Sequence, residues 1–280
     1  MTSGFEIAHE TRFEYTAPIS ETVMEMRLRP LDGAGQRCLE FHLEVEPRVR
    51  LGSYRDGYGN QVHYFNLLRD HRRLRVSSHS VVETGGGARP RRDDLVVDFL
   101  RYRSPVVDVP GVRKLAARHR PPAGAGPVAV EAALDALTLA ISRDFVYDPA
   151  VTNVYSAVDE VLELRAGVCQ DFAHLFIAAT RALGVPARYV SGYIYVAGES
   201  GITEGASHAW AEAWVRGRGW LGYDATHPIR AGANHVRVAV GRDYRDAAPT
   251  RGVYVGAATG TMDVSVRTRP LGVTPADHSG

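Results

Sequence analysis

The sequence is poor in the residues on which several classes of protein depend. It has two cysteines, Cys38 and Cys169, in 280 residues, too few for a disulfide-built secreted scaffold and without the CxxC spacing of a structural zinc site. Lys114 is the only lysine, and its surroundings lack the GxxxxGK[ST] pattern, which excludes a P-loop nucleotide hydrolase. The longest apolar stretch, 128–141, is interrupted by two acidic residues, so no membrane-spanning helix is expected.

The sequence also lacks an excess of charge of either sign. Its 33 basic and 32 acidic residues leave a formal net charge of +1, so no basic field attracts nucleic acid or anionic lipid. The first six residues, MTSGFE, contain neither the basic nor the apolar region of an export signal. We therefore expect no nucleic-acid or membrane partner and a cytoplasmic location, while the oligomeric state is left open.

The first third of the chain predicts β-strands. Short segments rich in β-branched and aromatic residues, separated by Gly, Pro, Asp or Asn clusters, lie at 5–15, 27–31, 38–45, 61–68 and 74–82. In the third segment apolar residues alternate with Glu and His, which gives one buried and one wet face. Residues 1–84 are therefore predicted as a small antiparallel β domain, followed by a Gly- and Arg-rich linker at 85–92.

Beyond the linker the apolar period changes from two toward 3.6. Helices are expected at 109–118, 128–143 and 156–164, and strands at 187–196, 207–215, 220–224, 235–240 and 262–267. The second domain, 93–270, is therefore predicted as α+β, with helices packed on a mostly antiparallel sheet. The tail, 271–280, is expected to be flexible.

One helical segment carries a nucleophile candidate at its start. Phe172 and Phe176 recur at helical spacing after Cys169, and Gly167 permits a tight turn into the helix. Cys169 then lies in the first helical turn, where unpaired amides and the helix dipole favour a thiolate. A buried structural thiol is the alternative for this residue, whereas Cys38 is expected to be structural.

Two further segments supply the partners that a reactive thiol needs. The strand SHAWAEAW contains His208, and GWLGYD ends at Asp224. A cysteine nucleophile requires an imidazole as base, and the imidazole requires a carboxylate that fixes its tautomer. In an antiparallel hairpin Asp224 can face His208 only if the loop has an odd length, because side chains alternate between faces. The three-residue loop 216–218 satisfies this rule and would pair Trp214 with Trp220.

The segments GVCQDFAHLF, HAWAEAW and GWLGYDAT together resemble the three motifs of the transglutaminase-like superfamily, of the bacterial type with an N-terminal β domain. The resemblance implies a papain-like core with Cys169 as nucleophile, His208 as general base and acid, and Asp224 as orienting carboxylate. It departs from the family pattern at Ala225-Thr226-His227, where Pro-Thr-Asn is more frequent. The implied activity is attack on an amide or isopeptide bond of a peptide or protein through an acyl-enzyme thioester.

Further residues are assigned around this catalytic group. The backbone amide of Cys169 is one expected oxyanion donor, with Tyr155 or Thr152 as the second, and Trp210 is a candidate for the substrate groove. Asp171 and His174 lie near the thiol in sequence, but an aspartate in a first helical turn is a partner of the helix dipole, so neither a metal nor a cofactor is expected. Glu212 could be a second acid, but we expect a strand carboxylate bonded to the backbone or to an arginine, and His227 is expected to be a loop residue.

Two other functions stay open at this point. The segment Arg165-Ala-Gly-Val-Cys169 weakly resembles the R-G-G-x-C motif of arylamine acetyltransferases, which would imply acyl transfer from a thioester donor. A peptide-binding module that retains the fold without catalysis is the non-enzymatic alternative. Hydrolysis and transfer to an amine differ in how well a groove excludes water, which the sequence does not encode.

Overall fold

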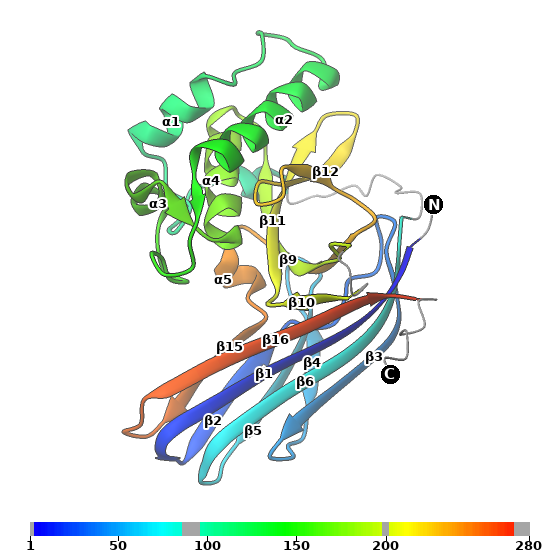
Figure 1. The fold of residues 1–280 in the computed structure, drawn as a ribbon, viewed down its shortest axis with the longest axis vertical. Helices are drawn as coiled ribbons and strands as arrows, with labels where there is room; N and C mark the ends of the chain where they lie inside the picture. Colours follow the sequence, from blue (N-terminus) through cyan, green and yellow to red (C-terminus); the bar gives the residue numbers. More distant parts are fainter. Residues whose placement is uncertain (1–2, 86–95, 198–201, 272–280) are drawn as a thin grey trace, which may run out of the picture.

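A computed structural model describes residues 3–85, 96–197 and 202–271 of the chain. Long, twisted strands form one end of the molecule, and helices packed on a separate sheet form the other (Figure 1). The two ends meet along β9, β10 and β16 (Figure 1). This arrangement confirms the predicted α+β class and the β domain that precedes the helical core.

The β domain is a pair of antiparallel sheets around an apolar core. The first sheet has the order β10-β16-β1-β6-β3 and the second β15-β2-β5-β4. The bounds are β1 Ser3–Ile19, β2 Glu21–Met26, β3 Arg37–Glu46, β4 Gly52–Arg55, β5 Gln61–Leu67, β6 His71–Thr84, β10 Thr203–Gly205, β15 Thr250–Val255 and β16 Gly260–Pro270. Alternate residues such as Met24, Phe65 and Val76 are buried between the sheets, as period-two patterning requires.

The strand content differs from the sequence prediction at both ends of the chain. The segment predicted at 262–267 as part of the second domain is β16, which pairs with β1 of the first. β15 likewise pairs with β2, whereas the strand predicted at 27–31 is absent and 21–26 is extended instead. Because β16 covers the backbone edge that β1 would otherwise expose, the end of the chain completes the first domain. Of the predicted linker and tail, residues 86–92 and 272–280 lie outside the described residues.

The second part is a five-stranded sheet of order β13-β12-β11-β9-β14 with helices on one face. Its strands are β9 Ala187–Ile194, β11 His208–Val215, β12 Gly219–Asp224, β13 Ile229–Ala231 and β14 His235–Gly241. Its remaining elements are η1 Val96–Leu100, α1 Pro110–Ala117, α2 Pro127–Asp144, β7 Val146–Tyr147, α3 Val158–Leu164, β8 Ala166–Gly167, α4 Cys169–Ala182 and α5 Tyr244–Ala247. The three helices predicted before Cys169 are confirmed as α1, α2 and α3.

Helix α4 is the central helix of this part. Nearly all of its residues are buried, and it packs on the face of β11 that carries Ala209, Ala211 and Ala213. Alanine side chains let the helix approach the sheet closely, so the start of α4 is fixed relative to β11. None of the helices in the described ranges is long and apolar enough to cross a bilayer.

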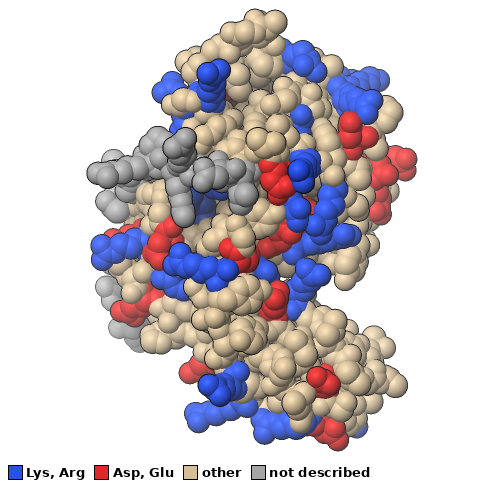
Figure 2. All heavy atoms as spheres, turned by 180° about the vertical axis from the view of Figure 1, so that it is seen from behind, with Lys and Arg blue, Asp and Glu red and all other residues tan. Residues whose placement is uncertain are grey.

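The β domain packs against the outer strand of the second sheet. The side-chain amide of Asn60 both donates to Val240 O and accepts from Val240 N, each at 2.8 Å. Gln36 does the same with the backbone of Arg237. These amides of the β domain bond to backbone groups that β14 would otherwise expose at its edge. The β domain and the second sheet are therefore joined by hydrogen bonds into one packed unit. Figure 2 shows basic and acidic side chains interspersed on the face turned away from the viewer of Figure 1.

Candidate active site

Cys169 is the first residue of α4, as predicted. The preceding residue, Val168, is extended, and its N–H donates to Asp171 Oδ2 at 2.8 Å. The same oxygen accepts from Thr152 Oγ1 at 2.6 Å, and burial raises the pKa of this carboxyl. An added Cβ at Gly167 would lie 2.7 Å from Asp171 Oδ2, so only glycine allows the capping aspartate to pack under the turn.

The hairpin that carries the other two residues has the predicted register. Trp214 pairs with Trp220 and Val215 with Gly219, which leaves a three-residue loop centred on Gly217, whose φ is +79°. Continuing the register sets Asp224 beside position 210, diagonal to His208. The odd loop length therefore puts the carboxylate and the imidazole on the same face of the sheet.

His208 and Asp224 form a short, buried hydrogen bond. His208 Nε2 lies 2.7 Å from Asp224 Oδ2, and the side chains are 8% and 0% exposed. Burial alone would lower the pKa of His208, but hydrogen bonds to Asp224 and Cys169 raise it to about 10. Because Nε2 faces the carboxylate, we infer that the thiol faces Nδ1. The contact between His208 and Asp224 is the predicted one, and the raised pKa of His208 favours a protonated imidazole beside Cys169.

Asp224 is held from several sides. Its Oδ1 accepts from the backbone N–H groups of Thr226, at 2.9 Å, and His227, at 3.2 Å. Its Oδ2 contacts His235 Nε2 at 3.2 Å and His227 Nδ1 at 3.3 Å, besides His208. Burial opposes the charge, but the three imidazoles keep the pKa of this carboxyl well below its usual range. The carboxylate is therefore charged and fixed in orientation.

His208, Asp224 and His227 also have the residue types of a metal site, and their ligand atoms lie within 4.8 Å of one another. Zinc–nitrogen and zinc–oxygen bonds of about 2.0 to 2.2 Å put two ligands of a tetrahedral ion roughly 3.3 Å apart. The 2.7 Å between His208 Nε2 and Asp224 Oδ2 is instead a hydrogen-bond length. The present arrangement fits a shared proton better than a shared cation.

The thiol and the imidazole open into a cleft of about 260 Å³ at the junction of the two parts. Tyr147 and Tyr193 line it from the helical part, β10 lines it along its length, and Val266 and Thr268 line it from β16. A strand of the β domain is therefore one wall of the cleft that contains Cys169 and His208.

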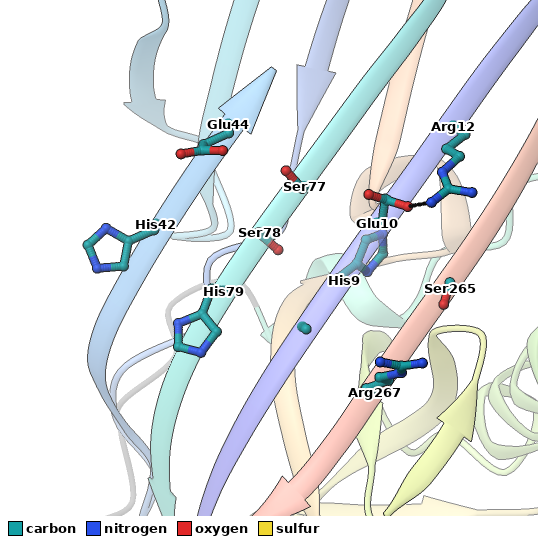
Figure 3. A pocket seen from close by; sticks show the side chains of 11 residues that line it. His9, Glu10, Arg12, His42, Glu44, Ser77, Ser78, His79, Ser265 and Arg267 are labelled. Atoms are coloured by element: carbon teal, nitrogen blue, oxygen red, sulfur yellow. Dashed lines mark ion pairs between the residues drawn. The ribbon is translucent and has the colours of Figure 1, made fainter. Parts of the chain in front are cut away.

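A larger hollow of about 530 Å³ lies on the outer face of the first β sheet (Figure 3). The small residues Ala8, Ser77 and Ser265 line it together with charged side chains. Among these, Arg12 pairs with Glu10 at 2.5 Å (Figure 3). It holds no cysteine and no carboxylate–imidazole–thiol arrangement, so the smaller cleft is the candidate active site on chemical grounds.

Three sequence-predicted site residues lie elsewhere than expected. Thr152 Oγ1 donates to Asp171, so its hydroxyl serves the helix cap and does not face the cleft. Tyr155 is 74% exposed and is not among the cleft-lining residues. Trp210 is 1% exposed and packs with Val190 and Val240. It shares a strand face with His208 as predicted, but the β domain covers that face, so it stacks beside the imidazole and does not line a groove.

The other residues weighed from the sequence have structural partners. Glu212 accepts from Arg188 Nε at 2.8 Å, so of the two expected partners, backbone and arginine, it bonds to the arginine. His174 is buried and accepts from the Tyr244 backbone N–H, and burial lowers its pKa to about 3. The sulfur of Cys38 lies 3.3 Å from the carbonyl oxygen of Glu40, far along the chain from the cleft lining.

Comparisons with known proteins agree with the geometry. Residues 5–83 match the bacterial transglutaminase-like N-terminal region, and residues 122–225 match the transglutaminase-like superfamily. An uncharacterized protein of Mycobacterium leprae (strain TN) is 34% identical over 278 residues, which cover 93% of this chain and 96% of the relative. The chain belongs to the transglutaminase-like superfamily.

Other similar proteins extend this picture. A candidate cysteine protease from Cytophaga hutchinsonii has a TM-score of 0.78 at 25% identity, covering 98% of this chain and 93% of that one. The protein-glutamine gamma-glutamyltransferase of Pseudomonas aeruginosa is 33% identical over 86 residues, which cover 29% of this chain and 13% of the relative. Membership of the transglutaminase-like superfamily and the likeness to the first of these support cysteine-based catalysis in general.

Two residues of this transglutaminase-like site were missed from the sequence. Tyr147 lines the cleft beside Cys169, and burial raises its pKa. His235 was assigned only as the start of a strand, yet it reaches Asp224. No local pattern distinguishes either residue, because each arrives at the site through the packing of separate elements. His227, predicted as a loop residue, lies in the turn after β12 and also lines the cleft.

Proposed function

We propose that this protein is an enzyme in which the Cys169 thiolate attacks the carbonyl carbon of an amide or isopeptide bond in a peptide or protein. The amine leaves with a proton from the His208 imidazolium, and the acyl group stays on sulfur as a thioester. Neutral His208 then takes a proton from water, or from an acceptor amine, which attacks the thioester and regenerates the thiolate. The hydrogen bond of 2.7 Å between His208 and Asp224 beside Cys169 is the observation that carries this proposal.

We propose that the tetrahedral oxyanion is stabilised by the backbone N–H of Cys169 and by the hydroxyl of Tyr147. The N–H of a first helical residue has no intrahelical acceptor, which leaves it available for an oxyanion. Tyr147 lines the cleft together with Cys169 and takes the place of Thr152 and Tyr155 in this role.

Hydrolysis is our leading choice of reaction, and transfer to an amine is the second. The cleft is bounded by exposed strand β10, whose Glu204 side chain is 63% exposed, so water has access to the thioester. The similar Cytophaga protein is described as a candidate cysteine protease. A cytoplasmic location, and the absence of nucleic-acid and membrane partners, stay predictions.

The thioester-donor alternative has less support. The Arg165 guanidinium lies 4.6 Å from the centre of the Phe145 ring and donates to Asp144 O, so it serves local packing and not a donor in the cleft. An inert peptide-binding module would not require the buried His208–Asp224 pair beside a thiol. Incubation with acetyl-CoA and an arylamine should therefore give no acetyl-enzyme.

The proposal is tested with a library of Gln-containing, isopeptide-linked and D-amino-acid peptides. Released amine and the mass of the acyl product are measured with and without hydroxylamine, which intercepts a thioester as a hydroxamate. We expect released amine from at least one class of peptide, and a hydroxamate product when hydroxylamine is present. Cys169→Ala should give neither product. Product formation that survives Cys169→Ala would contradict the proposal.

A further inference from the structure

We propose that His235 is a positioning residue of the active site, which holds the Asp224 carboxylate against His208 through a hydrogen bond from its Nε2–H. The inference rests on the proposed function and deepens it. It adds a fourth residue, from β14, to the three residues of α4, β11 and β12 that carry the reaction.

The hydrogen bonds of His235 define its tautomer. The Gly232 N–H donates to His235 Nδ1 at 3.3 Å, and a ring nitrogen that accepts a hydrogen bond carries no proton. The proton of the neutral ring therefore lies on Nε2, which is 3.2 Å from Asp224 Oδ2. His235 is thus oriented at one nitrogen by the backbone and donates with the other, as histidine partners in ordered sites commonly do.

Burial makes this contact stronger than a surface contact. The side chain of His235 is 2% exposed, against 42% for His227, the other additional imidazole on the carboxylate. The ring of Trp210 packs edge-on against His235 at 5.0 Å and stacks beside His208 at 6.0 Å. His235 therefore cannot swing away from Asp224 without displacing a fully buried tryptophan, whereas His227 lies in a turn that lines the cleft.

A third donor on Asp224 Oδ2 has a chemical role beside those of His208 and His227. Backbone N–H groups hold Oδ1, whereas Oδ2 must stay charged and directed at His208, because a shift of this oxygen or the loss of its charge removes support from the His208 imidazolium. A donor that is itself locked prevents rotation without competing for the proton on His208. The titratable groups around the pair are Cys169 from α4, Asp224 from β12, His227 from the following turn, His235 from β14, Tyr189 from β9 and Tyr147 from β7.

Replacing His235 with glutamine or with asparagine tests its two hydrogen bonds, to Asp224 and to Gly232, separately. In His235→Gln the side-chain amide nitrogen reaches roughly the position of Nε2, so a donor to Asp224 is retained. In His235→Asn the shorter side chain reaches only the position of Nδ1, so it can accept from Gly232 but cannot contact Asp224. Both variants are polar and of similar size, and His71→Asn is the matched control. His71 is a buried histidine of β6 that bonds to Thr22 and to the Arg69 carbonyl.

The experiment measures alkylation of Cys169 by iodoacetamide from pH 5 to pH 9, in full-length protein carrying Cys38→Ala. This readout reports the thiolate and needs no substrate. We expect His235→Gln and His71→Asn to stay within about threefold of the parent at pH 6. His235→Asn should react roughly tenfold more slowly at pH 6, with its midpoint displaced upward toward the ordinary thiol value of about 8.5.

The alkylation profiles distinguish a positioning role of His235 from ring packing, and both from failure of the proposed function. Equal profiles for the parent, His235→Asn and His235→Gln would overturn the positioning role. Equal losses in Asn and Gln would also overturn it, because they would assign the effect to ring packing. A parent whose Cys169 reacts at pH 6 no faster than glutathione would instead remove the proposed function, and with it the ion pair that His235 is inferred to support.

Discussion

At the scale of single residues, the site depends on charges that burial alone would not allow. His208 and Asp224 are both buried, and each raises the charged population of the other. The cost of removing two charges from water is offset by a short hydrogen bond and by further donors to the carboxylate. Loss of one partner therefore leaves an uncompensated buried charge.

Replacement of the nucleophile should abolish turnover and leave the fold intact. Cys169→Ala removes only a sulfur atom at a helix start, so we expect peptide turnover to fall by at least about 10³ with an unchanged unfolding temperature. Cys38→Ala is the control and should retain full activity. The assignment fails if Cys38→Ala, and not Cys169→Ala, removes turnover.

Removal of the carboxylate charge should destabilise the protein in a pH-dependent way. Asp224→Asn should lower the free energy of unfolding by about 3 kcal/mol at pH 6, since it breaks a buried pair. The pKa of His208 is raised to about 10 in the folded protein, so the stability it contributes is complete below the unfolded value of about 6.5 and is lost as pH rises toward 10.

The free energies of wild type and Asp224→Asn should therefore converge between about pH 6.5 and 10. Because the pKa of Asp224 is depressed, its own contribution should decline in the opposite direction, as pH falls below about 4. Urea unfolding at pH 5, 6, 8 and 9.5 measures the difference. If the difference in the free energy of unfolding between wild type and Asp224→Asn stayed constant over this range, the charges of His208 and Asp224 would not stabilise one another.

At the scale of elements, local geometry brings the residues together. The start of α4 fixes the thiol, and the odd loop of the β11–β12 hairpin fixes the parity of Asp224 relative to His208. Both follow from short-range rules, namely helix termination and strand alternation, so both were predictable from the sequence. The places of Tyr147, the proposed second oxyanion donor, and of His235 were not, because they depend on how β7 and β14 pack.

The turn before α4 provides a test at this scale. In Gly167→Ala the new Cβ would lie 2.8 Å from Asp171 Cβ and 2.7 Å from its Oδ2, so the capping carboxylate must move. We expect a loss of about 1 to 2 kcal/mol in stability, the usual cost of a helix cap, together with slower alkylation of Cys169 at pH 6.

The control for this variant is Gly57→Ala, since a Cβ at Gly57 meets nothing within 4 Å. Thermal unfolding and iodoacetamide labelling are measured on both variants. Identical behaviour of the two would mean that Gly167 does not hold the thiol in place.

At the scale of the whole molecule, strands from the two ends of the chain pair with each other. β16 pairs with β1, more than 240 residues away in sequence, and it also forms a wall of the cleft. Local patterns do not encode such pairing, which is why residues 262–267 were assigned to the wrong domain. The same packing covers the strand face of Trp210 that the alternation rule could not distinguish from a groove.

This closure predicts cooperative unfolding. Ile7 of β1 is buried in a cluster with Tyr193, Val236 and Val266, which spans both parts. All three tryptophans lie in the hairpin of the helical part, so their fluorescence reports that part together with the contact that Trp210 makes with the β domain. Ile7→Ala should lower stability by about 2 to 5 kcal/mol and shift the tryptophan transition together with the far-ultraviolet circular dichroism. Val253→Ala on β15, 70% exposed, should shift neither, and separate transitions would contradict the single packed unit.

The most direct test of the central claim compares the two cysteines within one molecule. Wild-type protein is treated with limiting iodoacetamide at pH 6, and modification of Cys169 and Cys38 is followed by peptide mass spectrometry. Burial raises the pKa of Cys38, so it is an internal reference. The account predicts that Cys169 reacts roughly 100-fold faster and that His208→Ala removes the advantage. Equal rates at the two thiols, or a fast Cys169 that does not need His208, would contradict it.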